Sequence, residues 1–195
     1  MSKTLVILDA GHGIDTKGKR SPDGRLLEYR YCRDLAGELC ARLRESNVDA
    51  LLLVPENMDI PLIERCNRAN AIAASTNKDC ILVSIHNNAA GMGHSWLNAS
   101  GWQACVYTKA SAASRRLASA LAKAAENKSL KVRRSTPRQD YWEMNLAICR
   151  NTTMPAVLTE NLFMDNKKEV DYLLSREGFE TIVDLHYQGI MDYLL

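Results

Sequence analysis

The chain has 195 residues, of which 46% are hydrophobic and 25% are charged, and its formal net charge is +2. This length suits one domain with a full core and is short for two. The near balance of charge argues against a nucleic-acid-binding protein, which usually carries a strong basic bias. Since no stretch reaches the length of a membrane-spanning helix, we expect no insertion into a membrane.

The N-terminal residues MSKTLVILDAGHG pass from one lysine into a short apolar run that ends at Asp9. A secretory signal has a longer apolar region followed by a cleavage site. We therefore expect synthesis in the cytoplasm without a signal peptide.

The cysteines are spread along the chain with no C-x-x-C pair, which argues against a thiolate zinc site and against a redox motif. Most fall on apolar positions of expected helices or strands. We expect free, buried thiols in a reducing compartment. The six are Cys32, Cys40, Cys66, Cys80, Cys105 and Cys149.

Strands and helices alternate in the first half of the chain. Residues 4–10 predict a buried strand, residues 28–46 a helix, and residues 49–54, DALLLV, a second buried strand. The apolar positions of that helix, at helical spacing, are Cys32, Leu35, Leu39 and Leu43.

A second helix is predicted over residues 59–75. Asp59 is a suitable cap, and Pro61 suits the first turn because its fixed φ is compatible with a helix start. The residues predicted on one side of this helix are Ile63, Cys66, Asn70 and Ala73.

The second half of the chain continues the alternation. Together the two halves predict an α/β fold, a three-layer sandwich in which helices cover both faces of a mainly parallel, twisted sheet of about six strands. The expected elements are strands over residues 80–86, 102–108 and 156–161, helices over 112–127, 166–174 and 176–193, a glycine- and asparagine-rich loop over 87–101, and a loop with a short element over 128–150.

Metal-competent side chains follow the expected strands, and ligands of open α/β sheets bind beyond the carboxyl ends of strands. His12 lies between Gly11 and Gly13, which give the backbone freedom and leave the ring unshielded. His86 ends the strand ILVSIH, and Glu28 opens the first long helix. Two histidines and a carboxylate predict a catalytic Zn²⁺ site with one position open for water.

Glu160 ends the strand AVLTE and is the remaining carboxylate of this set. A strand seldom ends on a buried carboxylate that has no partner. Zinc lowers the pKa of bound water to about 7, and a nearby glutamate can take that proton and pass it to a leaving amine. We therefore predict Glu160 as the catalytic acid–base residue.

Other polar residues have less certain roles. His186 falls on an apolar helical stripe, so core packing or a surface edge is expected, and His94 is expected to be a solvated loop histidine. Asp9, Ser84 or Asn87 could hold a liganding histidine by a hydrogen bond.

Five segments resemble, in order, the motifs of the zinc-dependent N-acetylmuramoyl-L-alanine amidases of the third amidase family, along almost the whole chain: LDAGHG, LLEYRYCRDLA, NRAN, ILVSIHNNA and CRNTTMPAVLTENLFMDN. The resemblance implies that His12, Glu28 and His86 bind Zn²⁺ and that Glu160 is the catalytic residue. It implies a single amidase catalytic domain over residues 1–195. The implied reaction is hydrolysis of the amide between N-acetylmuramic acid and L-alanine in bacterial peptidoglycan, by a lysin-type or wall-remodelling enzyme.

The chain departs from the family pattern in three places. The segment GWQACVY stands where a strand reading like GVEVY is usual. Asn161 stands after Glu160 where a small residue is usual, and the loop GIDTKGKRSPDGRL is longer and more basic than the commonest version. A second basic segment is predicted either to line the peptide side of the groove or to be a solvated loop. Its residues are Arg133, Arg134 and Arg138, with Tyr141 or Trp142 stacking on sugar or peptide.

Two other functions remain open from the sequence. One is a different zinc hydrolase with the same ligands, such as a carboxypeptidase or deacylase. The other is a non-catalytic wall-binding module of the same fold. Since no wall-binding repeats or export signal are found, the expected setting is a phage or prophage lysin that acts on the wall after lysis or release through a pore.

Overall fold

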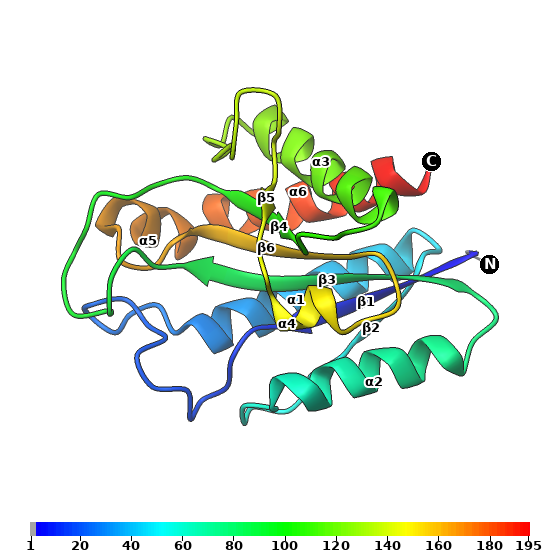
Figure 1. Ribbon diagram of the computed structural model, residues 1–195. Coiled ribbons are helices and arrows are strands. Elements are labelled where there is room, and N and C mark those ends of the chain that lie inside the picture. The colour runs from blue at the N-terminus through cyan, green and yellow to red at the C-terminus, as the bar shows by residue number, and fades with distance from the viewer. Residues whose placement is uncertain (1–2) are drawn as a thin grey trace.

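Residues 3–195, which a computed structural model describes, fold around a six-stranded sheet of order β2-β1-β3-β6-β4-β5 (Figure 1). The first four strands in this order are parallel, β4 is antiparallel to β6, and β5 is parallel to β4. The prediction of a mainly parallel sheet is confirmed. The strands are β1 (Thr4–Ala10), β2 (Asp49–Leu52), β3 (Asp79–Asn88), β4 (Gln103–Val106), β5 (Trp142–Glu143) and β6 (Ala156–Phe163).

Helices cover both faces of the sheet, as predicted for a three-layer sandwich. A larger core cluster joins one sheet face to four helices, and a smaller cluster joins the other face to two. The larger layer holds α1 (Glu28–Glu45), α3 (Ala112–Asn127), α5 (Lys167–Leu173) and α6 (Arg176–Leu194), and the smaller holds α2 (Leu62–Ala74) and α4 (Ala147–Arg150).

The first strand is apolar on both sides because it lies inside the sandwich. Val6 and Leu8 belong to the larger core cluster, whereas Ile7 between them belongs to the smaller one. Successive side chains of a strand point to opposite faces, so a continuous apolar run is needed here. The predicted stripe of α1 is likewise fully buried, with Leu35 and Leu39 at 0% exposure.

The predicted start of the second helix is wrong. Helix α2 begins at Leu62 with Pro61 at the N-cap position, so Asp59 lies outside it and is not the cap. Ile63, predicted on the same side of the helix as Cys66, is 62% exposed, whereas Arg65 is buried beside Cys66. Arg65 turns inward because Asp9 lies beneath it as a buried partner.

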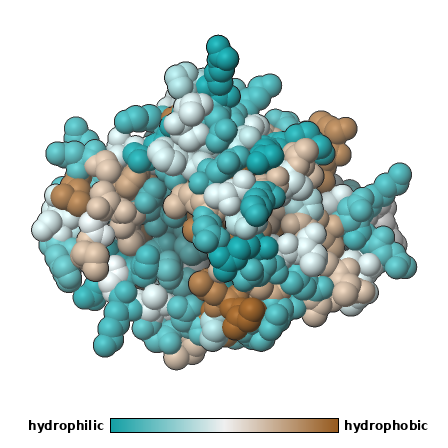
Figure 2. Space-filling view, viewed as in Figure 1, coloured by the Kyte–Doolittle hydropathy of each residue, from teal (hydrophilic) through white to brown (hydrophobic). Residues whose placement is uncertain are grey.

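The parallel strands all end on the same side, at the left of Figure 1. The blue loop that follows β1 and the green loop that follows β3 lie together at this edge. The face seen in Figure 2 is mostly hydrophilic, with an apolar patch over the start of α2. The exposed Leu62 and Ile63 belong to that end of the helix.

The six cysteines are all free and buried, as predicted. Burial raises the pKa of Cys105 and of Cys149 to about 12, so these thiols stay protonated at neutral pH. None of the helices between residues 3 and 195 is long and apolar enough to cross a membrane.

His186 is a core residue, one of the two places predicted for it. Its ring is 0% exposed, and Nδ1 donates to the carbonyl of Ile182 at 2.7 Å. Nε2 then accepts from the hydroxyl of Thr159 at 2.9 Å, which is the pattern of a neutral imidazole. Burial lowers the pKa of His186 to about 4.

We predict that His186 makes the protein sensitive to mild acid. The unfolded chain takes up a proton below its ordinary pKa of 6.5, whereas the folded ring stays neutral down to about 4. The free energy of unfolding therefore falls as the pH drops through this window, by roughly 3 kcal/mol in total. Denaturant unfolding at pH 7 and pH 4.5 should show a smaller fall in the free energy of unfolding for His186→Gln than for the parent protein. The control is His94→Gln, an exposed loop residue, and equal falls in all three proteins would contradict the prediction.

Candidate metal centre

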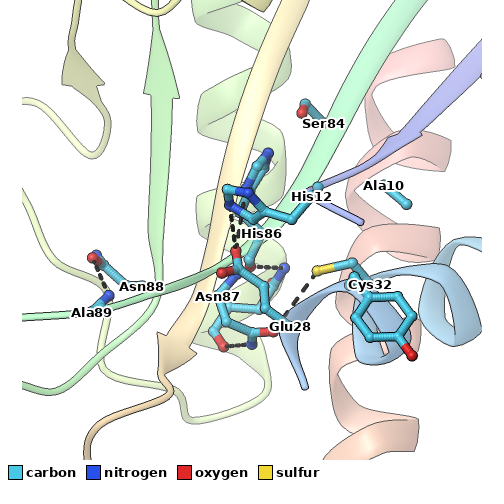
Figure 3. Close-up of polar contacts among 12 residues, drawn as sticks. Ala10, His12, Glu28, Cys32, Ser84, His86, Asn87, Asn88 and Ala89 are labelled. Carbon is cyan, nitrogen blue, oxygen red and sulfur yellow. Dashed lines mark hydrogen bonds and ion pairs between the residues drawn. The ribbon is translucent and has the colours of Figure 1, made fainter. Parts of the chain in front are cut away.

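The side chains of His12, Glu28 and His86 point toward one another at the carboxyl edge of the sheet (Figure 3). One ligand atom from each lies within 4.8 Å of the other two. Glu28 Oε1 is 3.4 Å from His12 Nε2 and 3.2 Å from His86 Nδ1. The three residues predicted from the sequence therefore converge from the loop after β1, the start of α1 and β3.

Gly11 and Gly13 are required for space rather than for unusual backbone angles. The residue with the left-handed conformation is His12 itself, with a φ of 58°. A Cβ on Gly11 would lie 2.4 Å from the His86 ring, and one on Gly13 would lie 2.0 Å from the backbone nitrogen of Asp59. The two glycines let neighbouring segments approach His12 closely.

Two arginines hold the backbone around His12 in place. Arg65 donates to the carbonyls of Ala10 at 2.6 Å and His12 at 3.2 Å. Arg33 donates to the carbonyls of Gly11 at 3.3 Å and His12 at 2.8 Å. Three consecutive carbonyls are thus bound by guanidinium groups, which offsets the cost of the left-handed residue.

Asp9 and Ser84 do not hold a liganding histidine, contrary to one of the predictions. The Asp9 carboxylate accepts from Arg65 at 2.7 Å and from Ser84 Oγ at 2.6 Å. Asp59 pairs with the same arginine at 2.9 Å and accepts from Thr16, which also accepts the Gly13 amide. These side chains secure the loop that carries His12.

Glu28 is fully buried at the start of α1. Its Oε1 accepts the backbone amide of Asn87 at 3.0 Å, so Asn87 acts through its main chain on the glutamate. Burial raises the pKa of Glu28, but hydrogen bonds to His12 and His86 outweigh that effect and hold it well below its usual range. Among residues 3–195, Glu28 Oε2 has no hydrogen-bond partner.

This donor set fits a zinc ion. Two imidazoles and one carboxylate, drawn from three different elements, are the ligands of many catalytic zinc sites. The unpartnered, buried Glu28 Oε2 is an acceptor that the surrounding chain leaves unsatisfied, and such groups are rare unless a ligand or ion uses them. The histidine side chains keep 20% and 17% exposure, so the centre opens to substrate.

Glu160 lies directly across the β3–β6 ladder from His86. Its Oε2 is buried, and no hydrogen bond to it is found within residues 3–195. Burial raises the pKa of Glu160 to about 7, even though the nearby His86 lowers it. A carboxyl group with such a pKa can both accept and donate a proton near neutral pH.

A β-bulge follows Glu160 and includes Asn161. The single residue between His86 and Asn88 faces two residues on β6, and Leu162 takes a φ of 64°. The Asn161 side chain donates to the carbonyl of His86 at 3.0 Å and accepts from Trp102 Nε1 at 2.8 Å. The buried amide of Asn161 therefore fixes the His86 backbone.

A cleft of about 410 Å³ contains His12, His86 and Glu160. Its opposite wall is apolar and comes from the start of α2 and from α4 with the residue before it, beside the apolar patch of Figure 2. The apolar wall residues are Ile60, Pro61, Leu62, Leu146, Ala147 and Ile148, and Leu158 lines the cleft from β6 beside Glu160.

The predicted basic segment near residue 133 lies at the sheet edge and is not part of the lining of this cleft in residues 3–195. Arg134 pairs with Glu126 on α3, and Arg138 is exposed. Trp142 Nε1 donates to the carbonyl of Arg133 and packs against the smaller core. These contacts favour a structural loop over a substrate surface.

Arg33 and Arg65, which bind the carbonyls around His12, are the functional residues that the sequence analysis missed. Arg65 shares a helix face with the buried Cys66 and Ala69. An arginine on an inward helix face, in a chain whose first strand ends on Asp9, is the signal that could have pointed to a buried ion pair.

Comparisons with known proteins agree with this geometry. The family model described as N-acetylmuramoyl-L-alanine amidase matches residues 6–192. An endolysin from Bacillus phage SPP1 is 32% identical over 205 residues, covering 100% of this chain and 67% of the endolysin. The amidase CwlM from Bacillus licheniformis is 26% identical over 185 residues, covering 95% of this chain and 66% of CwlM. The chain thus spans about two thirds of the length of these two curated relatives.

A solved structure extends the likeness to three dimensions. The crystal structure of an N-acetylmuramoyl-L-alanine amidase from Clostridium difficile 630 matches with a TM-score of 0.83 and 25% identity, over 97% of this chain and 96% of that chain. The sheet and its helices are therefore arranged alike in both proteins.

We predict that the buried Arg65 contributes far more to stability than Arg68, one turn further along α2. Arg65→Met leaves the Asp9 carboxylate unpaired in the interior, and loss of one partner of a buried pair costs about 3–5 kcal/mol. Arg68→Met removes only surface pairs with Glu56 and Glu64, which are worth about 1 kcal/mol or less. Denaturant unfolding of both variants would test this, and similar losses would contradict it.

Proposed function

The chain belongs to the N-acetylmuramoyl-L-alanine amidase family, and from this premise we propose that it hydrolyses the bond between N-acetylmuramic acid and L-alanine in peptidoglycan with the help of zinc. The observation that carries the proposal is the convergence of three metal-competent side chains near Glu160, whose buried Oε2 has no hydrogen-bond partner among residues 3–195. The whole of residues 1–195 then forms one amidase catalytic domain, of which residues 1 and 2 lie outside the described part.

In this proposal His12, Glu28 and His86 hold the zinc ion. Zinc supplies Lewis acidity, which polarises an amide carbonyl and makes water a stronger acid. The chain supplies the orientation of the ligands: Arg33 and Arg65 hold the backbone of His12, and the Asn87 amide holds Glu28 Oε1.

Glu160 moves the proton. Its carboxylate takes a proton from the attacking water and then gives it to the nitrogen of L-alanine as the carbon–nitrogen bond breaks. An amine is a poor leaving group until it is protonated, so this second transfer is needed for the products to separate. The free Oε2 of Glu160, in the same cleft as both histidines, suits this task.

The proposed setting is lysis of a bacterial wall. The similarity to a phage endolysin supports a lysin-type enzyme that reaches peptidoglycan after lysis or release through a pore. A different zinc hydrolase or a wall-binding module could use the same fold and the same three side chains. The experiments below distinguish these two functions from the amidase.

The first test is digestion of purified peptidoglycan with and without a chelator, followed by mass spectrometry. We expect stem peptides with a free L-alanine amino group, lost on chelation and restored by zinc. Hydrolysis that survives complete metal removal would refute the zinc dependence. Cleavage confined to other acylated amines would identify a different hydrolase.

The second test compares Glu160→Gln with Glu28→Gln. Glu160→Gln should keep zinc bound and lower kcat by about a hundredfold or more, because the proton shuttle is lost. Glu28→Gln should lose zinc, measured as metal content after gel filtration, since a carboxylate ligand becomes a neutral amide.

If the parent protein binds walls without hydrolysing them, and Glu160→Gln binds equally well, the protein is a wall-binding module.

A further inference from the structure

A second groove has a volume of about 700 Å³ and shares no lining residue with the cleft. It is formed by the loop after β1 and the tip of the loop after β3, and is lined by residues 14–20, Pro22, Leu27, Tyr29 and residues 92–94. Leu27 and Tyr29 flank the metal ligand Glu28 in sequence. The Lys19 carbonyl accepts the Glu28 amide at 3.0 Å. The groove therefore adjoins the start of α1, where Glu28 lies.

Three cations that have no salt-bridge partner among residues 3–195 line this groove. Lys17, Lys19 and Arg20 line it, and none of the three forms a salt bridge with a carboxylate in residues 3–195. Arg25 in the same loop behaves differently, because it pairs with Asp23 at 2.6 Å and with Asp171 at 2.7 Å.

One carboxylate lies among these cations. Asp15 lines the same groove, but its Oδ1 accepts the backbone amide of Asp59 at 2.7 Å and so secures the loop. The backbone hydrogen bond from the Glu28 amide to the Lys19 carbonyl places this loop next to a candidate metal ligand. Unpaired cations beside a reacting centre attract and orient an anionic substrate.

The shape of the groove depends on a close contact between its two loops. Gly93 has a φ of 80°, and a Cβ there would lie 3.0 Å from the carbonyl oxygen of Gly18. Apolar contact surface is provided by Ile14 at 58% exposure and Met92 at 84%. A groove with cations and exposed apolar side chains suits a peptide that carries both carboxylates and small apolar side chains.

The chemistry of the substrate decides which part of it this groove can bind. N-acetylmuramic acid has one carboxyl group, and in the scissile linkage that group is the amide, so the glycan side is uncharged. The carboxylates of the substrate are on the peptide side. Resting on the proposed function, we propose that Lys17, Lys19 and Arg20 bind the stem-peptide carboxylates, while the apolar cleft beside α2 and α4 takes the glycan side.

The experiment is a cycle of two substrates and two proteins. The substrates are N-acetylmuramoyl peptides whose stem carboxylates are either free or converted to amides. For the parent protein we expect amidation to lower kcat/KM about tenfold, mainly through KM, because charge pairing at a partly exposed site is modest. The triple variant K17Q/K19Q/R20Q should cleave both substrates at the lower kcat/KM, with kcat within about twofold of the parent.

The matched control is K3Q/K109Q/K123Q, which removes the same charge at exposed positions that are outside the groove. It should retain the parent's preference for the free carboxylates. An unchanged preference in K17Q/K19Q/R20Q would overturn the proposal while leaving the amidase function intact. Failure of the parent to cleave either substrate would instead refute the amidase function.

A third arm tests a different anion. Whole walls are digested before and after removal of their phosphodiester polymers. If the triple variant is impaired only on walls that retain these polymers, and not on the purified muramoyl peptides, the groove binds phosphate groups of the wall and the peptide proposal is wrong.

Discussion

The buried guanidinium of Arg65 is the contact on which the centre depends. It binds the Asp9 carboxylate near the end of β1 and the carbonyls of Ala10 and His12. These bonds fix the path of the chain where it leaves the sheet. Arg33 reaches the His12 carbonyl from the other side. A histidine with a positive φ is unfavourable by itself, and it persists because these charge-assisted bonds determine its backbone.

The other half of the centre rests on a polar network beneath β3 and β6. Asn161 joins the His86 carbonyl to Trp102, and Thr159 joins the same network to the buried ring of His186. Because this network is satisfied in the interior, it holds neighbouring strands in register where a purely apolar core would leave more freedom. Asn161 faces the larger core by the normal alternation of β6, and the bulge brings Leu162 to that same face.

The cleft and the groove differ in polarity. Apolar side chains from α2 and α4 line part of the cleft, whereas the loop after β1 presents cations in the groove. Within that loop, Lys17, Lys19 and Arg20 form no salt bridge in residues 3–195, whereas Arg25 pairs with Asp23 and Asp171. A substrate with one neutral and one anionic half can bind such a surface in only one orientation without losing favourable contacts.

Local patterns in the chain were enough to predict the α/β class, most element positions and the three residues that converge at the candidate metal site. Apolar periodicity depends on near neighbours, and the ends of parallel strands meet at one edge whatever the details of packing. The left-handed His12, the inward turn of Arg65 and the paired state of Asp9 were decided only by the folded chain. Each depends on contacts between segments far apart in sequence, such as Asp9 with Arg65 and Gly11 with His86, and no local pattern encodes their distances.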